Sequence, residues 1–204
     1  MGIKKILSLS ILAFLTVSCA STSPDSGAVE DVYVPTFKTL AHKGFTLVVP
    51  DETGWNVANE SEYKVELTKR GEVSGEVYTI QALLVRLPSF DNDDDFKGYV
   101  EKSMDAIDQK TQSTVIEQGS SFIPYNDNQC VHFNRKTEKT TGASQEEGAT
   151  PMVLEMVNFT CRHPLREDAG VYLAYAKRFQ EGSAEEDLTP QALNLFYNLE
   201  FTDL

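Results

Sequence analysis

The chain has 204 residues, 41% of them hydrophobic, and a formal net charge of −13 at pH 7. That length and apolar content suit one domain with a sizeable core. The excess of acidic residues argues against nucleic acid as a partner. It also argues against binding to anionic lipid through a basic segment, because both kinds of binding need clustered lysine and arginine. The composition therefore favours an acidic globular domain.

The N-terminus is similar to a bacterial lipoprotein signal. Lys4-Lys5 precedes the mostly apolar stretch Ile6–Val17, and Ser18-Cys19 follows it. A positive start, a short apolar run and a small residue before the cleavage point are typical of a secretory signal, whereas a bilayer span needs about 20 residues. The resemblance implies cleavage before Cys19 and lipidation of that cysteine, although Thr16 stands where such signals commonly have leucine. The alternative is an ordinary cleaved signal with an incidental cysteine.

Lipidation would also determine where the protein lies. Ala20 follows the cysteine, in place of the aspartate that marks inner-membrane retention in many lipoproteins. The resemblance therefore implies an outer-membrane anchor, with the domain facing the periplasm. We predict a signal peptide at residues 1–18, a lipid anchor and flexible tether at 19–43, and a single α+β domain at 44–204. Ser, Thr, Pro, Asp and Gly in the segment after the cysteine support the tether.

The first part of the domain is predicted to consist of strands and turns. Phe45–Val49 is a β-rich run ended by a proline, and the turn Asp51–Gly54 leads to Trp55, the only tryptophan and an expected core residue. Alternation in Tyr63–Leu67 predicts a half-buried strand. Val77–Leu87 is apolar on both faces, which predicts a central strand of a sheet.

A helix is predicted after the acidic segment Asp91–Asp95, which suits a helix start because carboxylates accept free backbone N–H groups there. It runs to about Lys110, and one apolar stripe at helical spacing comprises Phe96, Tyr99, Val100, Met104 and Ile107. Further extended segments are predicted at Thr114–Gln118, Ser121–Tyr125, Gln129–Glu138, Met152–Cys161 and Val171–Phe179, with a mobile loop at 140–149.

A second helix is predicted from Thr189, because a capping residue followed by Pro190 is a common helix start. Its expected buried face comprises Leu193, Phe196 and Tyr197. Ser183 and Glu186 match a capping box, so an earlier start is the alternative.

The predicted order of elements is an α+β fold, with a twisted antiparallel β-sheet flanked by two main helices. Phe45–Pro50 with Gly54-Trp55, the helix after Asp95 and the closing Leu195–Phe201 resemble the PsbP-like fold, which also occurs in small bacterial lipoproteins. The resemblance covers about Gly44 to Thr202 and rests on element order more than on any motif. It implies architecture and no particular chemistry, because one fold serves unrelated functions.

Three cysteines occur, at Cys19, Cys130 and Cys161. If Cys19 carries lipid, the other two remain in an oxidising compartment and are predicted to form a disulfide. A hairpin with a symmetric register around the 140–149 loop would place them opposite each other, and the closed loop would stabilise the fold by roughly 3–4 kcal/mol. A shifted register would instead gather both cysteines with His132 and His163 into a zinc or copper site, and two unpaired buried thiols are a third alternative.

The remaining motifs predict no catalytic site. Asp91–Asp95 lacks the Gly and Glu that an EF-hand loop needs at its sixth and twelfth places. Gly119-Ser120-Ser121 is not a G-x-S-x-G elbow, and nothing in the sequence places a histidine beside it. We therefore predict a non-catalytic, monomeric envelope lipoprotein without cofactor or metal, which binds an envelope protein or a small ligand. The alternative is a small metal-handling protein or a hydrolase.

Overall fold

The computed structural model describes residues 34–111, 113–126, 128–139, 151–183 and 186–204. Its elements are β1 (Thr39–His42), β2 (Phe45–Val48), β3 (Asn56–Ser61), β4 (Lys64–Arg70), β5 (Val77–Arg86), α1 (Asp93–Thr111), β6 (Ser113–Tyr125), β7 (Asn128–Lys139), β8 (Met152–His163), β9 (Arg166–Gln180), α2 (Thr189–Tyr197) and β10 (Leu199–Phe201). Cys19, the proposed leader and the 140–149 loop lie outside the described residues.

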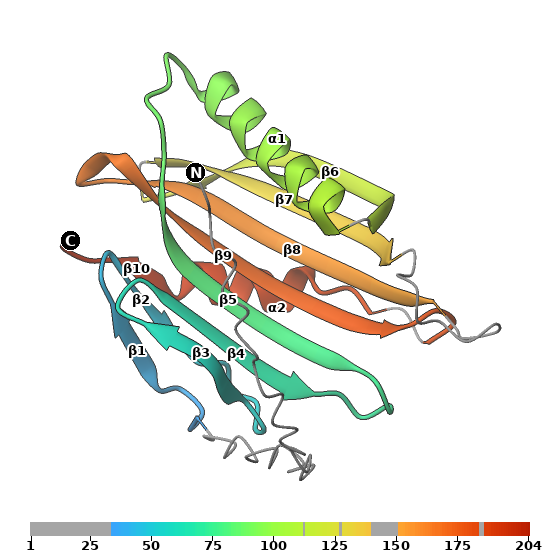
Figure 1. The fold of residues 1–204 in the computed structure, drawn as a ribbon. Helices are drawn as coiled ribbons and strands as arrows, with labels where there is room; N and C mark the ends of the chain where they lie inside the picture. The colour runs from blue at the N-terminus through green and yellow to red at the C-terminus, as the bar shows by residue number, and fades with distance from the viewer. Residues whose placement is uncertain (1–33, 112, 127, 140–150, 184–185) are drawn as a thin grey trace, which may run out of the picture. The chain divides into compact units, whose positions relative to one another are not determined.

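The strands form two antiparallel sheets (Figure 1). The large sheet has the order β3-β4-β5-β9-β8-β7-β6, and the small sheet has the order β1-β2-β10. The α+β class and the central position of β5 are confirmed, since β5 pairs with β4 on one side and β9 on the other. The prediction of one sheet is incomplete, because β10 returns after α2 to pair with β2 instead of joining the large sheet.

The folded domain begins before Gly44. Val34 is buried, and its N–H donates to the Trp55 carbonyl at 2.8 Å. β1 pairs with β2 along its whole length, and Leu40 on β1 buries its side chain in the core. Residues 34–43 therefore belong to the domain, and their assignment to a tether is wrong because they carry apolar side chains that the core covers.

The two helices pack on opposite faces of the large sheet (Figure 1). Successive strand residues point to opposite faces. Val131 on β7 clusters with Phe96 and Val100 of α1, whereas its neighbour Cys130 clusters with Leu195 of α2. We call these the α1 face and the α2 face. The larger core lies on the α2 face and includes the small sheet.

Helix α1 begins at the predicted acidic segment. The Asn92 side chain accepts the N–H of Asp95 at 2.9 Å, and three aspartates lie in the first turn, where they oppose the positive end of the helix dipole. Of the predicted stripe, Phe96, Val100 and Met104 are buried, but Tyr99 and Ile107 are 37% and 51% exposed. The apolar stripe is therefore wider than the surface that the sheet covers.

Two local predictions are wrong. The segments 114–118 and 121–125 form one strand, β6, which has an irregularity between Val115 and Glu117. In α2 the buried side chains are Ala192, Leu195 and Phe196, whereas Tyr197 is 59% exposed. The buried residues Leu188 and Leu199 flank α2 and determine which side of the helix faces the core, since positions 188, 192, 195, 196 and 199 lie on one helical stripe.

The helix α2 starts at Thr189, with no side-chain cap from Leu188. The alternative start at Ser183 is wrong, because Glu186 bonds to other strands as described below. Among the described helices, neither is long and apolar enough to cross a bilayer.

Candidate binding site

The β7–β8 hairpin has the predicted symmetric register. Cys130 lies opposite Cys161, and the pairing continues to Lys139 opposite Met152. The structure joins the two cysteines in a disulfide with a Cα–Cα distance of 4.3 Å, and both are buried in the core of the α2 face. The bond crosslinks neighbouring strands, so neither sulfur is a free nucleophile or a metal ligand.

The two histidines lie apart. His132 faces Phe159 and stacks on it with ring centroids 5.2 Å apart. His163 Nε2 lies 3.1 Å from the carbonyl oxygens of Gly44 and Thr202, and its Nδ1 accepts the N–H of Leu165 at 3.2 Å. The shifted register that would gather both histidines with the cysteines is therefore wrong. Within the described ranges, no three His, Cys, Asp or Glu side chains are grouped so that they could hold a metal ion.

One serine lies beside a histidine, although nothing in the sequence predicted a histidine next to Ser120 or Ser121. Ser121 Oγ is 3.3 Å from His132 Nδ1, because the β6–β7 register sets them opposite each other. The other ring nitrogen, Nε2, is buried and meets no hydrogen-bond partner in the described part of the chain. A nucleophile–base pair needs a third group that orients the base, and among the described residues no side chain bonds to His132 Nε2 to do so. Ser120 donates instead to the carboxylate of Glu101.

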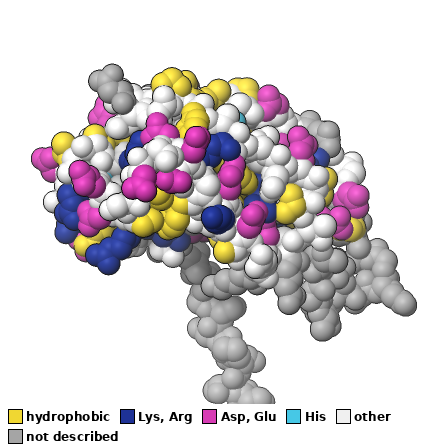
Figure 2. Space-filling model, turned by 90° about the horizontal axis from the view of Figure 1, so that it is seen from above, with side chains coloured by type: hydrophobic (Ala, Val, Ile, Leu, Met, Phe, Trp, Pro, Cys, Tyr) yellow, Lys and Arg dark blue, Asp and Glu magenta, His cyan; other side chains and the backbone are white. Residues whose placement is uncertain are grey.

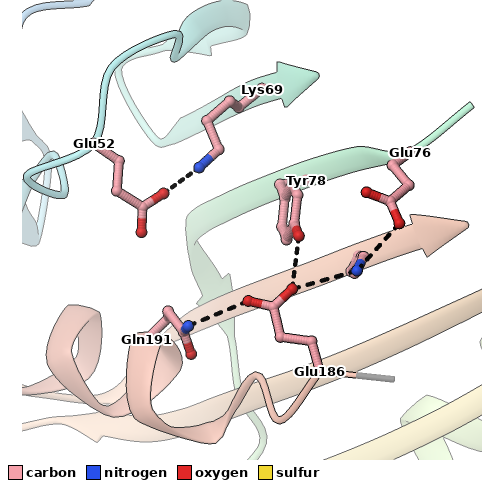
Figure 3. A network of polar contacts seen from close by, with 7 residues as sticks. Glu52, Lys69, Glu76, Tyr78, Glu186 and Gln191 are labelled. Atoms are coloured by element: carbon pink, nitrogen blue, oxygen red, sulfur yellow. Dashed lines mark hydrogen bonds and ion pairs between the residues drawn. The ribbon is translucent and has the colours of Figure 1, made fainter. Parts of the chain in front are cut away.

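A buried lysine on β9 is the centre of a polar network (Figure 3). Lys177 is only 4% exposed, and its Nζ lies 3.3 Å from both Glu76 Oε1 and Glu186 Oε2. The Tyr78 hydroxyl donates to Glu186 at 2.7 Å, and the Gln191 amide donates to the same carboxylate at 3.4 Å. We call these five residues the Lys177 network. They tie β5, β9 and the start of α2 together on the α2 face.

The protonation states of the network follow from its contacts. Burial lowers the pKa of Lys177, but hydrogen bonds to Tyr78, Glu186 and Glu76 outweigh it, so the pKa is raised overall. Burial, followed by the hydrogen bond to Glu186, raises the pKa of Tyr78. At neutral pH the lysine is therefore an ammonium and the tyrosine a phenol. Neither group is in the form of a nucleophile or a general base.

A cleft of about 550 Å³ lies beside this network, with Lys69 and Glu52 on its wall. Lys69 pairs with the Glu52 carboxylate, and its Nζ is 5.1 Å from the Trp55 ring centroid and 5.0 Å from that of Tyr78. Figure 3 shows the Glu52 carboxylate and the Lys69 ammonium turned toward each other, separate from the contacts around Glu186. A ligand here would have to break existing ion pairs, so the cluster is suited to stabilising the fold.

An apolar groove lies between α1 and the large sheet, and we call it the α1 groove. It comprises two adjoining cavities of about 250 and 410 Å³, both lined by Gln81, Met104, Ile107 and Tyr172. The strand register sets its floor, with Leu83 opposite Tyr172 and Gln81 opposite Ala174. Helix α1 forms one wall, through Tyr99, Ser103 and Ile107 among others.

The groove collects apolar side chains that packing leaves uncovered. Tyr99, Ile107 and Leu154 line it and are 37%, 51% and 40% exposed. All three methionines after Met1, namely Met104, Met152 and Met156, line it as well. Methionine side chains adapt to ligands of varied shape. Figure 2 views the molecule from the side on which α1 lies in Figure 1, and hydrophobic side chains show between charged ones across that surface.

Of the Lys177 network, only Glu186 stood out in the sequence, and there as half of a capping box. Of the residues that line the groove, the apolar stripe of α1 was the one predicted as a group. One signal was present: Lys177 is in phase with Val171, Leu173, Tyr175 and Phe179, the buried side of an apolar strand. A lysine in that phase requires a buried partner. The glutamates that supply it are distant in sequence and carry no comparable signal.

No family model and no curated protein matches the chain. Several solved structures are similar in fold, among them the following three. The solution structure of cyanobacterial PsbP (CyanoP) from Synechocystis sp. PCC 6803 is 9% identical with a TM-score of 0.50, and the match covers 92% of this chain and 99% of that one. The crystal structure of the Saccharomyces cerevisiae Ran-binding protein Mog1p is 11% identical with a TM-score of 0.45, covering 82% and 97%. A structure from Bacteroides thetaiotaomicron VPI-5482 is 12% identical with a TM-score of 0.42, covering 83% of this chain and 50% of that one.

At these identities the similarity concerns fold alone. The likeness to CyanoP over almost the whole of both chains confirms the PsbP-like architecture predicted from the sequence. The class of protein is thus an α+β domain of PsbP-like fold, and its function has to be argued from its own sites.

Proposed function

We propose that the protein is a non-catalytic lipoprotein of the bacterial envelope whose domain binds a small apolar molecule in the α1 groove. The observation that carries the proposal is the groove itself. It is an apolar hollow beside exposed Tyr99 and Ile107, and its larger cavity of about 410 Å³ has the size of a small-molecule site. A folded protein partner would need a wider surface than this.

The absence of a complete catalytic constellation among the described residues supports the non-catalytic part. Lys177 is held between two carboxylates, and Cys130 and Cys161 are bonded to each other. The Ser121–His132 pair has no orienting acid within the part of the chain that the structure describes. Lys177 and the two cysteines stabilise the fold. The α1 groove provides a surface for contact with a ligand but contains no activated nucleophile or general base among the described residues.

The leader supports the envelope part of the proposal. An acylated Cys19 would attach the domain to the outer membrane, with the segment before Val34 as the connection and the domain facing the periplasm. Mass spectrometry of the protein purified from membranes tests this directly. We expect a mature N-terminus at an acylated Cys19, and a free cysteine or cleavage at another residue would contradict the anchor.

A groove-filling variant tests the binding function. Ser103 lines the groove from α1, so Ser103→Phe would place a ring in it without touching the core. We expect binding of the fluorescent probe N-phenyl-1-naphthylamine to the wild-type protein, and at least ten-fold weaker binding to this variant. Gln109→Phe is the matched control, because Gln109 is exposed and lies roughly 120° around the helix from Ser103. Equal probe binding by all three proteins would contradict the proposed site.

A further inference from the structure

We infer that the ligand of the α1 groove is an amphiphile with a carboxylate head, of the fatty-acid class, whose head lies at Arg178 and Arg135. This inference rests on the proposed function and specifies its ligand. It follows from the difference between the two ends of the groove.

Two arginines line one end of the α1 groove. On the α1 face, Arg178 of β9 lies opposite Leu154 of β8, and Arg135 of β7 lies opposite Met156, two residues further along the same strand. Both arginines line the cavity of about 410 Å³ together with the hydroxyl-bearing Thr137. The pairing thus brings two guanidinium groups from separate strands to one end of an apolar groove.

These guanidinium groups keep unused donors. Arg178 is exposed and makes no hydrogen bond or ion pair with another described residue. Arg135 is 4% exposed, and its Nη2 pairs with Asp105 at 3.4 Å and with Asp108. Its Nε and Nη1 meet no hydrogen-bond partner within the described ranges. A buried donor without a partner is costly, so a ligand acceptor placed there gains more than one placed in water.

The free donors at this end favour an anion. Asp105 and Asp108 both pair with Arg135, so the charges of the two arginines and the two carboxylates balance in total. Arg178 still has no partner of its own among the described residues, and Nε and Nη1 of Arg135 have no acceptor there. An ammonium head has only donors and cannot satisfy these guanidinium groups, and a neutral hydroxyl would leave the charge of Arg178 unpaired. A carboxylate can accept two donors from each planar guanidinium.

The other end suits an acyl chain. The cavity of about 250 Å³ is lined mostly by apolar side chains, including Leu83, Val85, Leu87 and Val100. One arginine, the exposed Arg86, also lines it, so this end has one guanidinium where the other end has two. Tyr172 lines both cavities and so lies between the two ends. Burial raises the pKa of its hydroxyl, which within the described residues donates to the Met156 sulfur at 3.4 Å. From Tyr172 to Arg178, six residues of strand span about 20 Å. That length accommodates an extended chain such as that of dodecanoate.

The test compares three amphiphiles that have the same chain length and different head groups. Dodecanoate, dodecanol and dodecylamine, each below its micellar concentration, compete with N-phenyl-1-naphthylamine for the full chain carrying Cys19→Ser, so that no attached acyl group competes. We expect dodecanoate to bind at least ten-fold more tightly than dodecanol, and dodecylamine to bind most weakly. Arg178→Gln should weaken dodecanoate about ten-fold, the value of one charge-assisted hydrogen bond, and leave dodecanol within two-fold.

Arg70→Gln is the matched control. Arg70 is another exposed arginine without a described partner, but it lies at the end of β4 beside the Lys177 network, outside the groove. Equal affinity for the three heads, or no effect of Arg178→Gln, would overturn the carboxylate inference and leave the groove as an apolar site. Failure of every amphiphile and of the probe to bind the wild-type protein would overturn the proposed function itself.

Discussion

The two faces of the large sheet differ in how completely they are covered. On the α2 face, Trp55, Phe159 and Phe196 are almost completely buried, a disulfide joins two strands, and a buried lysine has two carboxylate partners. On the α1 face, the buried cluster is small, and Ile107 and Leu154 stay exposed beside unpaired guanidinium donors. Most of the buried core therefore lies on the α2 face, whereas the α1 face keeps the exposed apolar surface on which the proposed binding site rests.

The largest expected difference concerns the aromatic core. Phe196 lies 4.3 Å from Phe159 and 4.8 Å from Tyr125 between ring centroids, so Phe196→Ala should lower the free energy of unfolding by about 3–5 kcal/mol. Ile107→Ala on the other face should cost less than about 1 kcal/mol, because that side chain is 51% exposed. Urea denaturation measures both, and similar losses on the two faces would refute the comparison.

Removal of the disulfide should have the next largest effect. The bond closes a separation of 31 residues, so the variant Cys130→Ala/Cys161→Ala should lose about 3–4 kcal/mol of unfolding free energy. Probe binding in the α1 groove should be retained, since the bond lies on the α2 face. Reduction of the wild-type protein serves as the control and should shift the urea midpoint in the same direction. An unchanged midpoint in both experiments would mean that the bond contributes nothing to stability.

The Lys177 network should contribute somewhat less than the disulfide to the free energy of unfolding. Lys177→Met leaves Glu76 and Glu186 facing each other without a cation, and we expect a loss of about 2–3 kcal/mol, reduced from the fully buried case because the Glu186 side chain is 38% exposed. Adding Glu76→Gln to this variant should restore part of the loss. Lys69→Met, which breaks a more exposed pair with Glu52, is the control and should cost less. The prediction fails if both lysine variants unfold at the same urea concentration.

The smallest expected effect is the change of stability with pH that His132 causes. Burial lowers the pKa of His132 below its ordinary value of 6.5. The unfolded chain therefore binds a proton more readily than the folded one, so stability is full above about pH 6.5 and falls as the pH drops through the lowered folded value. His132→Gln should reduce the slope of stability between about pH 7 and 5. Ser121→Ala, which keeps the imidazole, should retain that slope, and identical slopes in the wild-type and His132→Gln proteins would contradict the assignment.

The sequence predicted features with a strong local period. The stripe from Phe96 to Ile107 and the aspartates before it identified α1, and the positions of Cys130 and Cys161 gave the correct hairpin register. The short strands were missed: β1, β3 and β10 contain six residues or fewer. β1 and β3 each pair with the next strand in the chain, whereas β10 pairs with β2, about 150 residues earlier. Tertiary pairing, not local preference, determines such strands.

The sites were harder to predict than the fold. Lys177 and Arg178 are neighbours, yet they point to opposite faces and serve different environments, as alternation along a strand requires. Their partners, Glu76 and Glu186 on one face and the α1 groove on the other, come from segments separated by many residues. Contacts between segments so far apart leave no periodic pattern in the sequence, so they could not be predicted from it.

One measurement tests the central claim, that the α1 groove is the binding site, most directly. The chain has four methionines, and the three after Met1 all line the groove, so methyl-¹³C-methionine NMR reports on it selectively. During titration with dodecanoate we expect the methyl resonances of Met104 and Met156 to shift together and to saturate at one equivalent. If dodecanoate binds while the resonances of Met104, Met152 and Met156 stay in place, the ligand binds elsewhere and the account is wrong.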